Sequence, residues 1–457
     1  MLTATDPSTG KLLHEVPAAT SAQVEDILSR AETAFKSWRT RSFNERAEVL
    51  LKVARLMRED VDRLAILMTE EMGKPIKEAR AEVIKSAWCA EHYAENAEAY
   101  LQPQTLGSDA TLSYVQHLPL GVILGILPWN APFWLAFRYA APTLMAGNTC
   151  VMKHDPHVPA CAQAIADLFV QVGAPADIFQ NLPLETPAVE AVIRDKRIQA
   201  VSFTGSEKGG GAVASIAASE IKHSVLELGG SDPCIVLADA NLDEAADIIT
   251  LSRIINAGQS CIAAKRIIVE ASVYDSLVEK VHERLARLKM GDPREESTDI
   301  GPIARSDLRD NLHRQVTASV DAGARCLLGG EMPAGPGYFY PVTLLVDVTE
   351  SMVASCEETF GPVAVIMKAE NEEQAIAIAN NSDYGLAAAV WTRADRGEAI
   401  ARRLEVGQVA VNGIVKTDPC LPSGGIKRSG IGRELGPHGI REFVNAQQVW
   451  IGPKQGS

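Results

Sequence analysis

The chain has 457 residues, of which 46% are hydrophobic and 22% are charged. That composition is typical of a globular protein with large cores, and the length predicts two or three domains rather than one. The formal net charge of −14 repels phosphate backbones, so we expect no nucleic-acid partner.

Targeting signals and metal-binding patterns are not evident in the sequence. The first residues contain neither a basic stretch nor an apolar one, so we expect no secretory signal. The longest apolar run, Leu118 to Trp129, is interrupted by proline and glycine and is too short to span a membrane. The eight cysteines are scattered, without a C-x-x-C pair or metal-ligand spacing. We therefore predict reduced thiols, a cytoplasmic location and no bound metal.

The first hundred residues have a helical pattern. Residues 20–23, Thr-Ser-Ala-Gln, match a capping box, and apolar residues follow at helical spacing as far as Phe35. A second amphipathic helix is predicted near residues 44–59.

Short apolar strands alternate with helices from about residue 120. The predicted strands are 122–127, 149–152, 200–203, 224–226 and 234–237, with a helix at 160–172. This alternation predicts a parallel sheet covered on both faces, with ligands at the carboxyl ends of its strands. A second α/β pattern begins after about residue 241 and continues to about residue 430. The strand-like piece 447–451 is predicted to pair with 111–117, outside both domains.

Three side chains suit covalent chemistry on a carbonyl group. Cys261 follows small and polar residues and is a candidate nucleophile, although most cysteines in such a chain are buried and inert. Glu227 ends an apolar strand, where a raised pKa would suit a general base; the alternative is a solvated glutamate. Asn130 follows another strand and either donates its amide to an oxyanion or occupies a turn.

A glycine-rich segment at residues 203–211 could bind phosphate. Glycines that open a helix after a strand leave backbone N–H groups free to bind a phosphate. The segment lacks the P-loop lysine and does not fit the G-x-G-x-x-G fingerprint, because Ala214 takes the last position. A plain loop is therefore the alternative reading.

The order of seven motifs along the chain identifies a family resemblance. They are Pro128-Trp-Asn130, Lys153, Phe203-Thr-Gly-Ser206, Glu227-Leu-Gly-Gly230, Gly258-Gln-Ser-Cys261, Glu358-Thr-Phe-Gly-Pro362 and Gly424-Gly-Ile-Lys-Arg-Ser-Gly430. Together they resemble the aldehyde dehydrogenase superfamily over essentially the whole chain. The resemblance implies an α/β fold with three parts: a Rossmann-like NAD(P)-binding domain at 1–100 and 120–229, an α/β catalytic domain at 230–431, and a small β oligomerisation element at 101–119 and 440–457.

The resemblance also implies roles for individual residues. Cys261 would attack an aldehyde to give a thiohemiacetal and then a thioester, Asn130 would bind the oxyanion, and Glu227 would activate water. The product would be a carboxylic acid, and the cofactor NAD or NADP. The residues that would bind the cofactor are Trp129, Lys153, Gly205, Ser206, Gly210, Leu228, Glu358 and Phe360.

One departure from the family pattern bears on the choice of cofactor. Many NAD-preferring members carry a glutamate three residues after the lysine, where this chain has Pro156. Either Asp155 substitutes for that carboxylate, or the 2′-phosphate of NADP meets no repulsion. The alternative is that Pro156 only shapes a turn.

The predicted substrate site is similar to one branch of the succinate-semialdehyde dehydrogenases. The similarity rests on Lys-His-x-Pro at 153–156, Thr417-Asp418 and Gly-Arg-Glu-Leu-Gly at 432–436. The predicted substrate residues are Arg138, Ala131, Trp134, Thr417 and Ser423. Arg138 would bind a substrate carboxylate, or else form a structural ion pair.

Three positions leave a different substrate open. Ala131 and Ser423 replace frequent phenylalanines, so the substrate tunnel should be wider or more polar. Ile255 stands where some semialdehyde enzymes have a second arginine. A bulkier polar or aromatic aldehyde is therefore the alternative substrate.

Two functions other than aldehyde oxidation are less consistent with the sequence. A CoA-acylating enzyme would pass the acyl group to a thiol, but the presence of Glu227 favours water. A non-catalytic protein on an old enzyme scaffold should have lost Cys261 or Glu227, and both are present. We expect a small aldehyde as the only partner apart from a second copy, in a homodimer or homotetramer without membrane contact.

Overall fold

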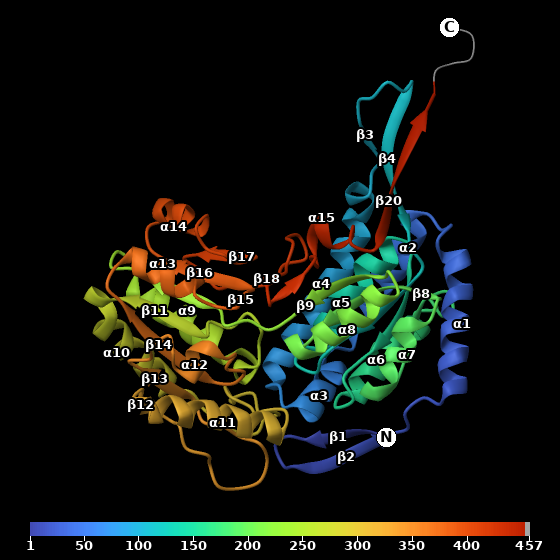
Figure 1. Cartoon of the computed structure of the whole chain (residues 1–457). Helices are drawn as coiled ribbons and strands as arrows, with labels where there is room; N and C mark the ends of the chain where they lie inside the picture. Colours follow the sequence, from blue (N-terminus) through green and yellow to red (C-terminus); the bar gives the residue numbers. More distant parts are fainter. Residues whose placement is uncertain (453–457) are drawn as a thin grey trace.

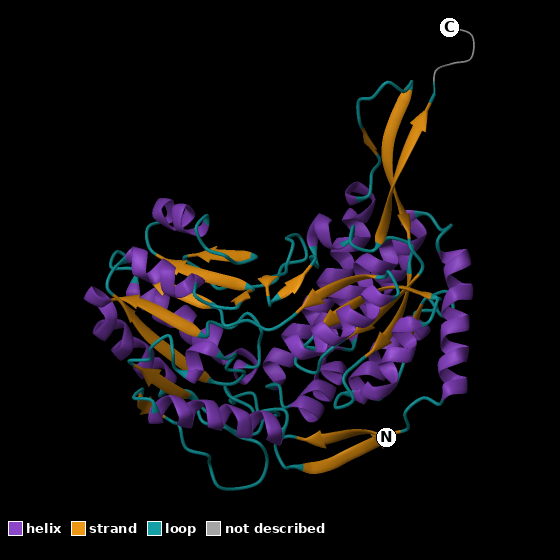
Figure 2. Ribbon diagram, in the orientation of Figure 1, coloured by secondary structure: helices purple, strands orange, loops and turns teal. Residues whose placement is uncertain are grey.

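The computed structural model describes residues 1–452. Figure 1 shows two α/β bodies side by side, with a three-stranded sheet projecting from one of them. Figure 2 shows that helices cover both faces of the larger sheets. The arrangement is the predicted α/β class with a separate small β element.

The N-terminal hundred residues form a hairpin and four helices. Their bounds are β1 Leu2–Asp6, β2 Lys11–Val16, α1 Ser21–Trp38, α2 Phe43–Glu59, α3 Val61–Met72 and α4 Ile76–Tyr100. The capping box predicted at 20–23 is confirmed, since Thr20 and Gln23 satisfy each other's backbone N–H groups. Helix α4 packs against α2 and α5. Within residues 1–452, no helix has the length and hydropathy needed to cross a membrane.

The first sheet has the strand order β19-β9-β8-β5-β6-β7. Its strands are β5 Val122–Ile126, β6 Thr149–Lys153, β7 Phe179–Asn181, β8 Ile198–Thr204, β9 His223–Glu227 and β19 Gly430–Ile431, and its helices are α5 Pro132–Met145, α6 Pro159–Gln171, η1 Thr186–Ala188, α7 Val189–Arg194 and α8 Glu207–Ser219. All pairs are parallel except β19 with β9. Strands β5 and β6 are fully buried, as expected for a sheet covered on both faces.

The second sheet has the strand order β12-β13-β14-β11-β10-β16-β17. Its strands are β10 Pro233–Val236, β11 Arg266–Glu270, β12 Arg325–Leu328, β13 Thr343–Val346, β14 Val363–Ala369, β16 Ala387–Trp391 and β17 Gln408–Val411. The helices of this part are α9 Leu242–Ile254, η2 Ile255–Gly258, η3 Ala271–Val273, α10 Tyr274–Leu285, α11 Ser306–Asp321, α12 Val353–Cys356, α13 Glu372–Asn380 and α14 Ala394–Ala401. The sequence pattern predicted that the second α/β part begins after about residue 241. The predicted strand at 234–237 is β10 of the second sheet, so this part begins earlier.

A small sheet projects from the first body (Figure 1). Strand β4 Leu112–Pro119 pairs antiparallel with β20 Val444–Ile451 and with β3 Gln104–Thr105. The register joins Pro119 to Val444 and Leu112 to Ile451, which confirms the predicted pairing of 447–451 with 111–117. Residues 453–457 of the predicted oligomerisation element lie outside the described residues, and the domain boundaries stay predictions.

The remaining short elements lie near the interface between the two bodies. They are β15 Tyr384–Gly385, β18 Ile426–Lys427 and α15 Gly436–Gly439. Strand β18 pairs with β15, and the chain then returns to the first sheet through β19. This return brings residues 423–434 next to the carboxyl end of β9, where Glu227 lies.

Candidate active site

A central cavity of about 350 Å³ lies between α4, α5, the segment before Cys261 and residues 414–417. Six predicted residues line it: Cys261, Asn130, Ala131, Trp134, Arg138 and Thr417. Ser423 is not among the described lining residues; it is buried, and its backbone pairs with that of Glu434. The structure therefore brings together the predicted nucleophile, oxyanion donor and most of the predicted substrate residues.

The backbone before Cys261 is strained and firmly held. Asn256, Ala257 and Gly258 all have left-handed φ angles, of 56°, 52° and 74°. A non-glycine residue adopts this conformation at an energetic cost, so neighbouring contacts must maintain it. Arg253 provides such contacts, since its Nη2 donates to the carbonyl oxygens of Gly258 and Gly361, both at 2.7 Å. These contacts hold residues 256–261 in place; they are called the nucleophile segment below.

The Cys261 thiol is shielded from solvent and has charged side chains nearby, two of them cations. Burial raises its pKa to about 11, while Lys265 and Arg138 oppose that shift. Nζ of Lys265 also donates to the carbonyl oxygens of Ser260 and Cys261. The protonated thiol is therefore the resting form at neutral pH, and a base is needed to generate the thiolate.

Asn130 is fixed beside the same segment. Its Nδ2 donates to the carbonyl oxygen of Gln259 at 3.1 Å, two residues before Cys261. Its own carbonyl oxygen accepts from Nζ of Lys74 at 2.9 Å and from Nδ2 of Asn256 at 2.8 Å. The side-chain amide is thereby held against the nucleophile segment, where a developing oxyanion can be stabilised.

Glu227, at the end of β9, belongs to a buried charge cluster with Arg138 and Glu434. Nη2 of Arg138 lies 3.2 Å from Oε2 of Glu227 and 2.5 Å from Oε2 of Glu434. Burial raises the pKa of Glu227 to about 7, and Arg138 opposes the shift. Oε1 of Glu227 has no hydrogen-bond partner among the described residues. A buried carboxyl that titrates near neutrality suits a general base.

The predicted cofactor residues gather at the carboxyl ends of β6, β8 and β9. Lys153 ends β6, and Ser206 caps α8 by accepting from the Gly209 N–H at 3.2 Å. Gly210 lies directly under Leu228: a Cβ atom there would come within 2.5 Å of Leu228 Cδ2. A lysine and the start of a glycine-rich helix at one strand edge fit the phosphates and ribose of a dinucleotide.

Glu358 and Phe360 approach this edge from the second body. Oε1 of Glu358 accepts from the Gly230 N–H and lies the same distance, 3.1 Å, from Nζ of Lys265. A Cβ atom on Gly229 would meet Oε2 of Glu358 at 2.3 Å, so a larger residue there would displace this carboxylate. Phe360 packs edge-on against Trp129, with ring centroids 5.8 Å apart. Glu358 and Phe360 of the second body thus contact Gly230 and Trp129 near this edge of the first sheet.

Several charged side chains of the site were not found from the sequence. Lys74, Glu78, Glu82 and Lys85 line the central cavity from α4 and the residues just before it. Their spacing indicates one helix face, but that pattern alone is equally typical of a solvated face. Lys265 is fully buried next to Cys261, and nothing in the local sequence distinguishes it from a surface lysine.

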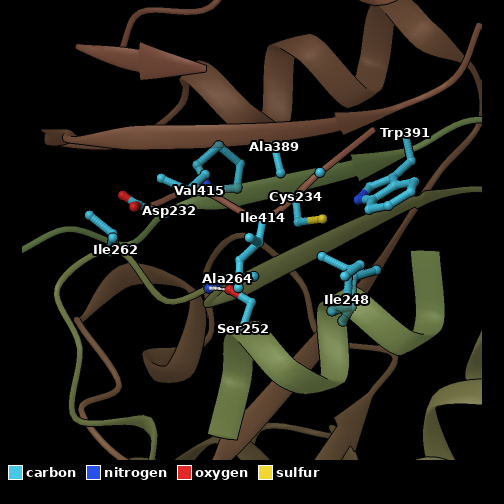
Figure 3. Close-up of a pocket in the computed structure, with 13 residues that line it drawn as sticks. Asp232, Cys234, Ile248, Ser252, Ile262, Ala264, Ala389, Trp391, Ile414 and Val415 are labelled. Carbon is cyan, nitrogen blue, oxygen red and sulfur yellow. Dashed lines mark hydrogen bonds between the residues drawn. The ribbon is translucent and has the colours of Figure 1, made fainter. Parts of the chain in front are cut away.

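A second, much smaller pocket lies beside the central cavity (Figure 3). It shares Ser252, Ile262, Ile414 and Val415 with the cavity and extends under β16 towards Trp391. Its volume of about 10 Å³ holds at most one water molecule, so it is not a ligand site. No group of three or more His, Cys, Asp or Glu side chains within residues 1–452 is arranged to hold a metal ion.

Known proteins match this chain over its whole length. The model of the aldehyde dehydrogenase family matches residues 1–449. This chain belongs to the aldehyde dehydrogenase family. A probable NADP-dependent succinate-semialdehyde dehydrogenase of Synechocystis is 46% identical over 98% of both chains. NADP-dependent succinate-semialdehyde dehydrogenase 1 of Mycobacterium tuberculosis is 45% identical, also over 98% of both.

Solved aldehyde dehydrogenases have the same fold. The crystal structure of succinic semialdehyde dehydrogenase from Streptococcus pyogenes, in complex with NADP+, superposes with a TM-score of 0.97. That protein is 36% identical, and the alignment covers 99% of this chain and 100% of the other. The family assignment confirms the predicted fold class and the prediction of an NAD(P)-dependent aldehyde-oxidising enzyme.

Proposed function

We propose that this aldehyde dehydrogenase oxidises succinate semialdehyde, or a closely related aldehyde that carries a carboxylate, with Cys261 as the nucleophile. The observation that carries the proposal is the central cavity, in which Cys261 shares the walls with Arg138, Lys85 and Thr417. A cavity that combines a thiol with cationic and hydroxyl side chains suits an aldehyde with an anionic end. The names of the relatives from Synechocystis and Mycobacterium support the same substrate.

Glu227 has two proton-transfer tasks in this proposal. Burial raises the pKa of the Cys261 thiol to about 11 and that of Glu227 to about 7, so proton transfer from the thiol to the carboxylate is uphill. Glu227 would therefore accept the thiol proton as the sulfur attacks the carbonyl carbon, which consumes the thiolate as it forms. Asn130 Nδ2 would then turn from the Gln259 carbonyl oxygen to the oxyanion of the thiohemiacetal. When bound, the dinucleotide accepts the hydride that this adduct releases, which leaves a thioester on Cys261.

Glu227 must release the thiol proton to solvent before it can act as the base in hydrolysis of the thioester. Its Oε1 has no partner among the described residues, so this oxygen can take a proton from the attacking water. Arg138 donates a hydrogen bond to the other oxygen, Oε2, and so fixes the orientation of the carboxylate. Lys153, Ser206, Gly210 and Glu358 would hold the cofactor at the carboxyl ends of β6, β8 and β9.

NADP is the proposed cofactor. Pro156 lies in a turn closed by the Val158 N–H and the Asp155 carbonyl oxygen, so no carboxylate projects from position 156. Asp155 itself is engaged, because its Oδ1 accepts from the backbone N–H of His157 and pairs with the ring. These contacts orient the Asp155 carboxylate towards His157, and position 156 has no carboxylate to bind a ribose diol or repel a 2′-phosphate.

A homodimer or homotetramer in the cytoplasm is the proposed working state. The projecting sheet leaves Trp450 and Ile451 of β20 exposed, which is unusual for the surface of an isolated subunit. All eight cysteines are free, as expected in a reducing compartment.

The proposal is tested by following the absorbance of the reduced nicotinamide that the reaction forms. Wild-type enzyme is assayed with succinate semialdehyde, butanal and benzaldehyde, with NAD or NADP, and with or without CoA. We expect the highest kcat/KM with succinate semialdehyde and NADP, and no dependence on CoA. Cys261→Ala should be inactive with every substrate while still binding cofactor. A preference for butanal or benzaldehyde would contradict the proposed substrate.

A further inference from the structure

Four charged side chains, from α4 and the residues just before it, line the central cavity. Two of the four neutralise each other. Lys74 forms an ion pair with Glu82, and both are buried. Glu82 also accepts from the backbone N–H groups of Phe133 and Trp134, at 3.0 and 3.2 Å. This pair is therefore structural and leaves no charge to attract a substrate.

The third charged side chain, Glu78, supports the nucleophile segment. Its Oε2 accepts from the backbone N–H of Asn256 at 2.6 Å. Burial raises the pKa of Glu78 to about 7, so at neutral pH it is ionised only about half of the time. It does not oppose the approach of an anion as a fully ionised carboxylate would.

Lys85 differs from the other three because no carboxylate pairs with it in the described part of the chain. Its Nζ donates to Oγ1 of Thr417 at 2.8 Å and lies 4.2 Å from the ring centroid of Trp134. Both contacts fix the ammonium group at the cavity wall without neutralising it. Burial lowers the pKa of Lys85 to about 8, and repulsion from Arg138 adds to this effect. An anion between the two cations would relieve the repulsion.

Four hydrogen-bond donors remain free on three groups: two on Lys85, one on Thr417 and one at Nε of Arg138. An ammonium group has three N–H bonds, and Lys85 uses one for Thr417. The Thr417 hydroxyl accepts that bond, so its own hydrogen can still be donated. Nε of Arg138 is buried and has no hydrogen-bond partner among the described residues. A carboxylate has enough lone pairs to accept from all three groups.

We propose that Lys85, with the Thr417 hydroxyl, binds the carboxylate at the far end of the substrate, and that Nε of Arg138, whose Nη2 is already paired with two carboxylates, donates an additional hydrogen bond. This inference rests on the proposed function, since it needs an aldehyde that carries a carboxylate. Lys85 thereby determines specificity: it selects anionic aldehydes of a length that spans from Cys261 to the α4 wall. Lys416 also lines the cavity but is exposed, so solvent screens its charge and weakens its effect.

The test compares kcat/KM for succinate semialdehyde with that for butanal, an aldehyde of equal chain length without a carboxylate. We expect Lys85→Met to lower the ratio of the two values by about 10- to 100-fold, because a charge-assisted contact is lost. Lys85→Arg should restore most of the ratio. Lys77→Met is the matched control: Lys77 lies on α4 outside the cavity lining and pairs with Asp299.

Inhibition by succinate measures the same contact without turnover of a semialdehyde. With butanal as substrate, Lys85→Met should raise the inhibition constant of succinate by about 10-fold or more. If Lys85→Met does not fold, Lys85→Gln is measured in its place. Equal losses for both aldehydes, or unchanged inhibition by succinate, would overturn the role of Lys85 but leave the proposed substrate standing. A wild-type enzyme that does not prefer succinate semialdehyde would overturn the proposed function itself.

Discussion

Nη2 of Arg138 lies 3.2 Å from Oε2 of Glu227, and both side chains are buried. Glu434 shares the same guanidinium nitrogen. Although burial disfavours the charged guanidinium, Glu434 and Glu227 outweigh it and keep the pKa of Arg138 above its usual value. The arginine expected to bind the substrate carboxylate is thus also the residue that orients the proposed general base.

The first prediction follows from this double contact. Arg138→Ala removes the partner of two buried carboxylates, which costs about 3–5 kcal/mol when one member of a buried ion pair is deleted. We expect a lower melting temperature and a lower kcat with every aldehyde, because Glu227 loses its orientation. In addition, KM should rise more for succinate semialdehyde than for butanal. An unchanged kcat for butanal would show that Arg138 does not act through Glu227.

Thioester hydrolysis should depend on the ionisation of Glu227. The carboxylate form accepts a proton and the acid form does not, so the rate should rise as pH increases through about 7 and then level off. Glu227→Gln should abolish this rise and, because Glu227 also accepts the thiol proton, slow formation of the thioester. At alkaline pH, where part of the Cys261 thiol ionises without Glu227, a thioester should accumulate on Cys261, which intact-protein mass spectrometry detects as added acyl mass. Absence of the adduct in the variant, with normal turnover, would assign the proton transfer to another group.

Local features of the sequence predicted local structure well. The capping box at Thr20 and the strand ending in Glu227 depend on neighbouring residues, and both are present. The pairing of 447–451 with 111–117 was also predicted, because both are strand-like pieces left outside the two domains. For β10 the two predictions differed: the strand pattern grouped residues 234–237 with the first sheet, whereas the catalytic domain predicted from the family resemblance, 230–431, included them. Strand composition alone does not say which sheet a strand joins.

The charge pairing in the site could not be predicted from the sequence. Glu434 lies about 300 residues from Arg138 along the chain, and only the return of the chain through β19 brings them together. Lys85 and Thr417, which form a hydrogen bond, are 332 residues apart in the sequence. Ser423 was predicted to line the substrate site, yet the structure pairs its backbone with Glu434. Long-range contacts of this kind depend on the packing of two bodies rather than on a motif.

The cofactor preference should change when a carboxylate is placed at position 156. Pro156→Glu would put a negative charge near the predicted ribose site, and two like charges a few ångströms apart repel by about 1 kcal/mol or more. We expect kcat/KM for NADP to fall about tenfold relative to NAD. Pro156→Gln, of equal size but neutral, is the control for loss of the proline turn. Equal losses for the two cofactors would place the 2′-phosphate elsewhere.

Glycine should be required at position 258, within the nucleophile segment. Its φ of 74° is unfavourable for any residue with a Cβ, and that atom would lie 2.2 Å from the carbonyl oxygen of Gly361. Gly258→Ala must therefore shift the segment that carries Cys261. Gly173→Ala is the matched control, because Gly173 has a φ of 67° but open space around it.

The two alanine variants separate backbone strain from steric clash. Gly173→Ala should lower the free energy of unfolding by about 1 kcal/mol through φ alone and leave kcat unchanged. Gly258→Ala should lower the stability by at least about 2 kcal/mol and reduce kcat more than tenfold, since a small displacement of a nucleophile has a large effect on rate. Chemical denaturation and steady-state kinetics on the same preparations give both quantities. A Gly258→Ala enzyme with wild-type kcat would mean that the nucleophile segment tolerates the displacement, and that its rigidity is not needed for the reaction.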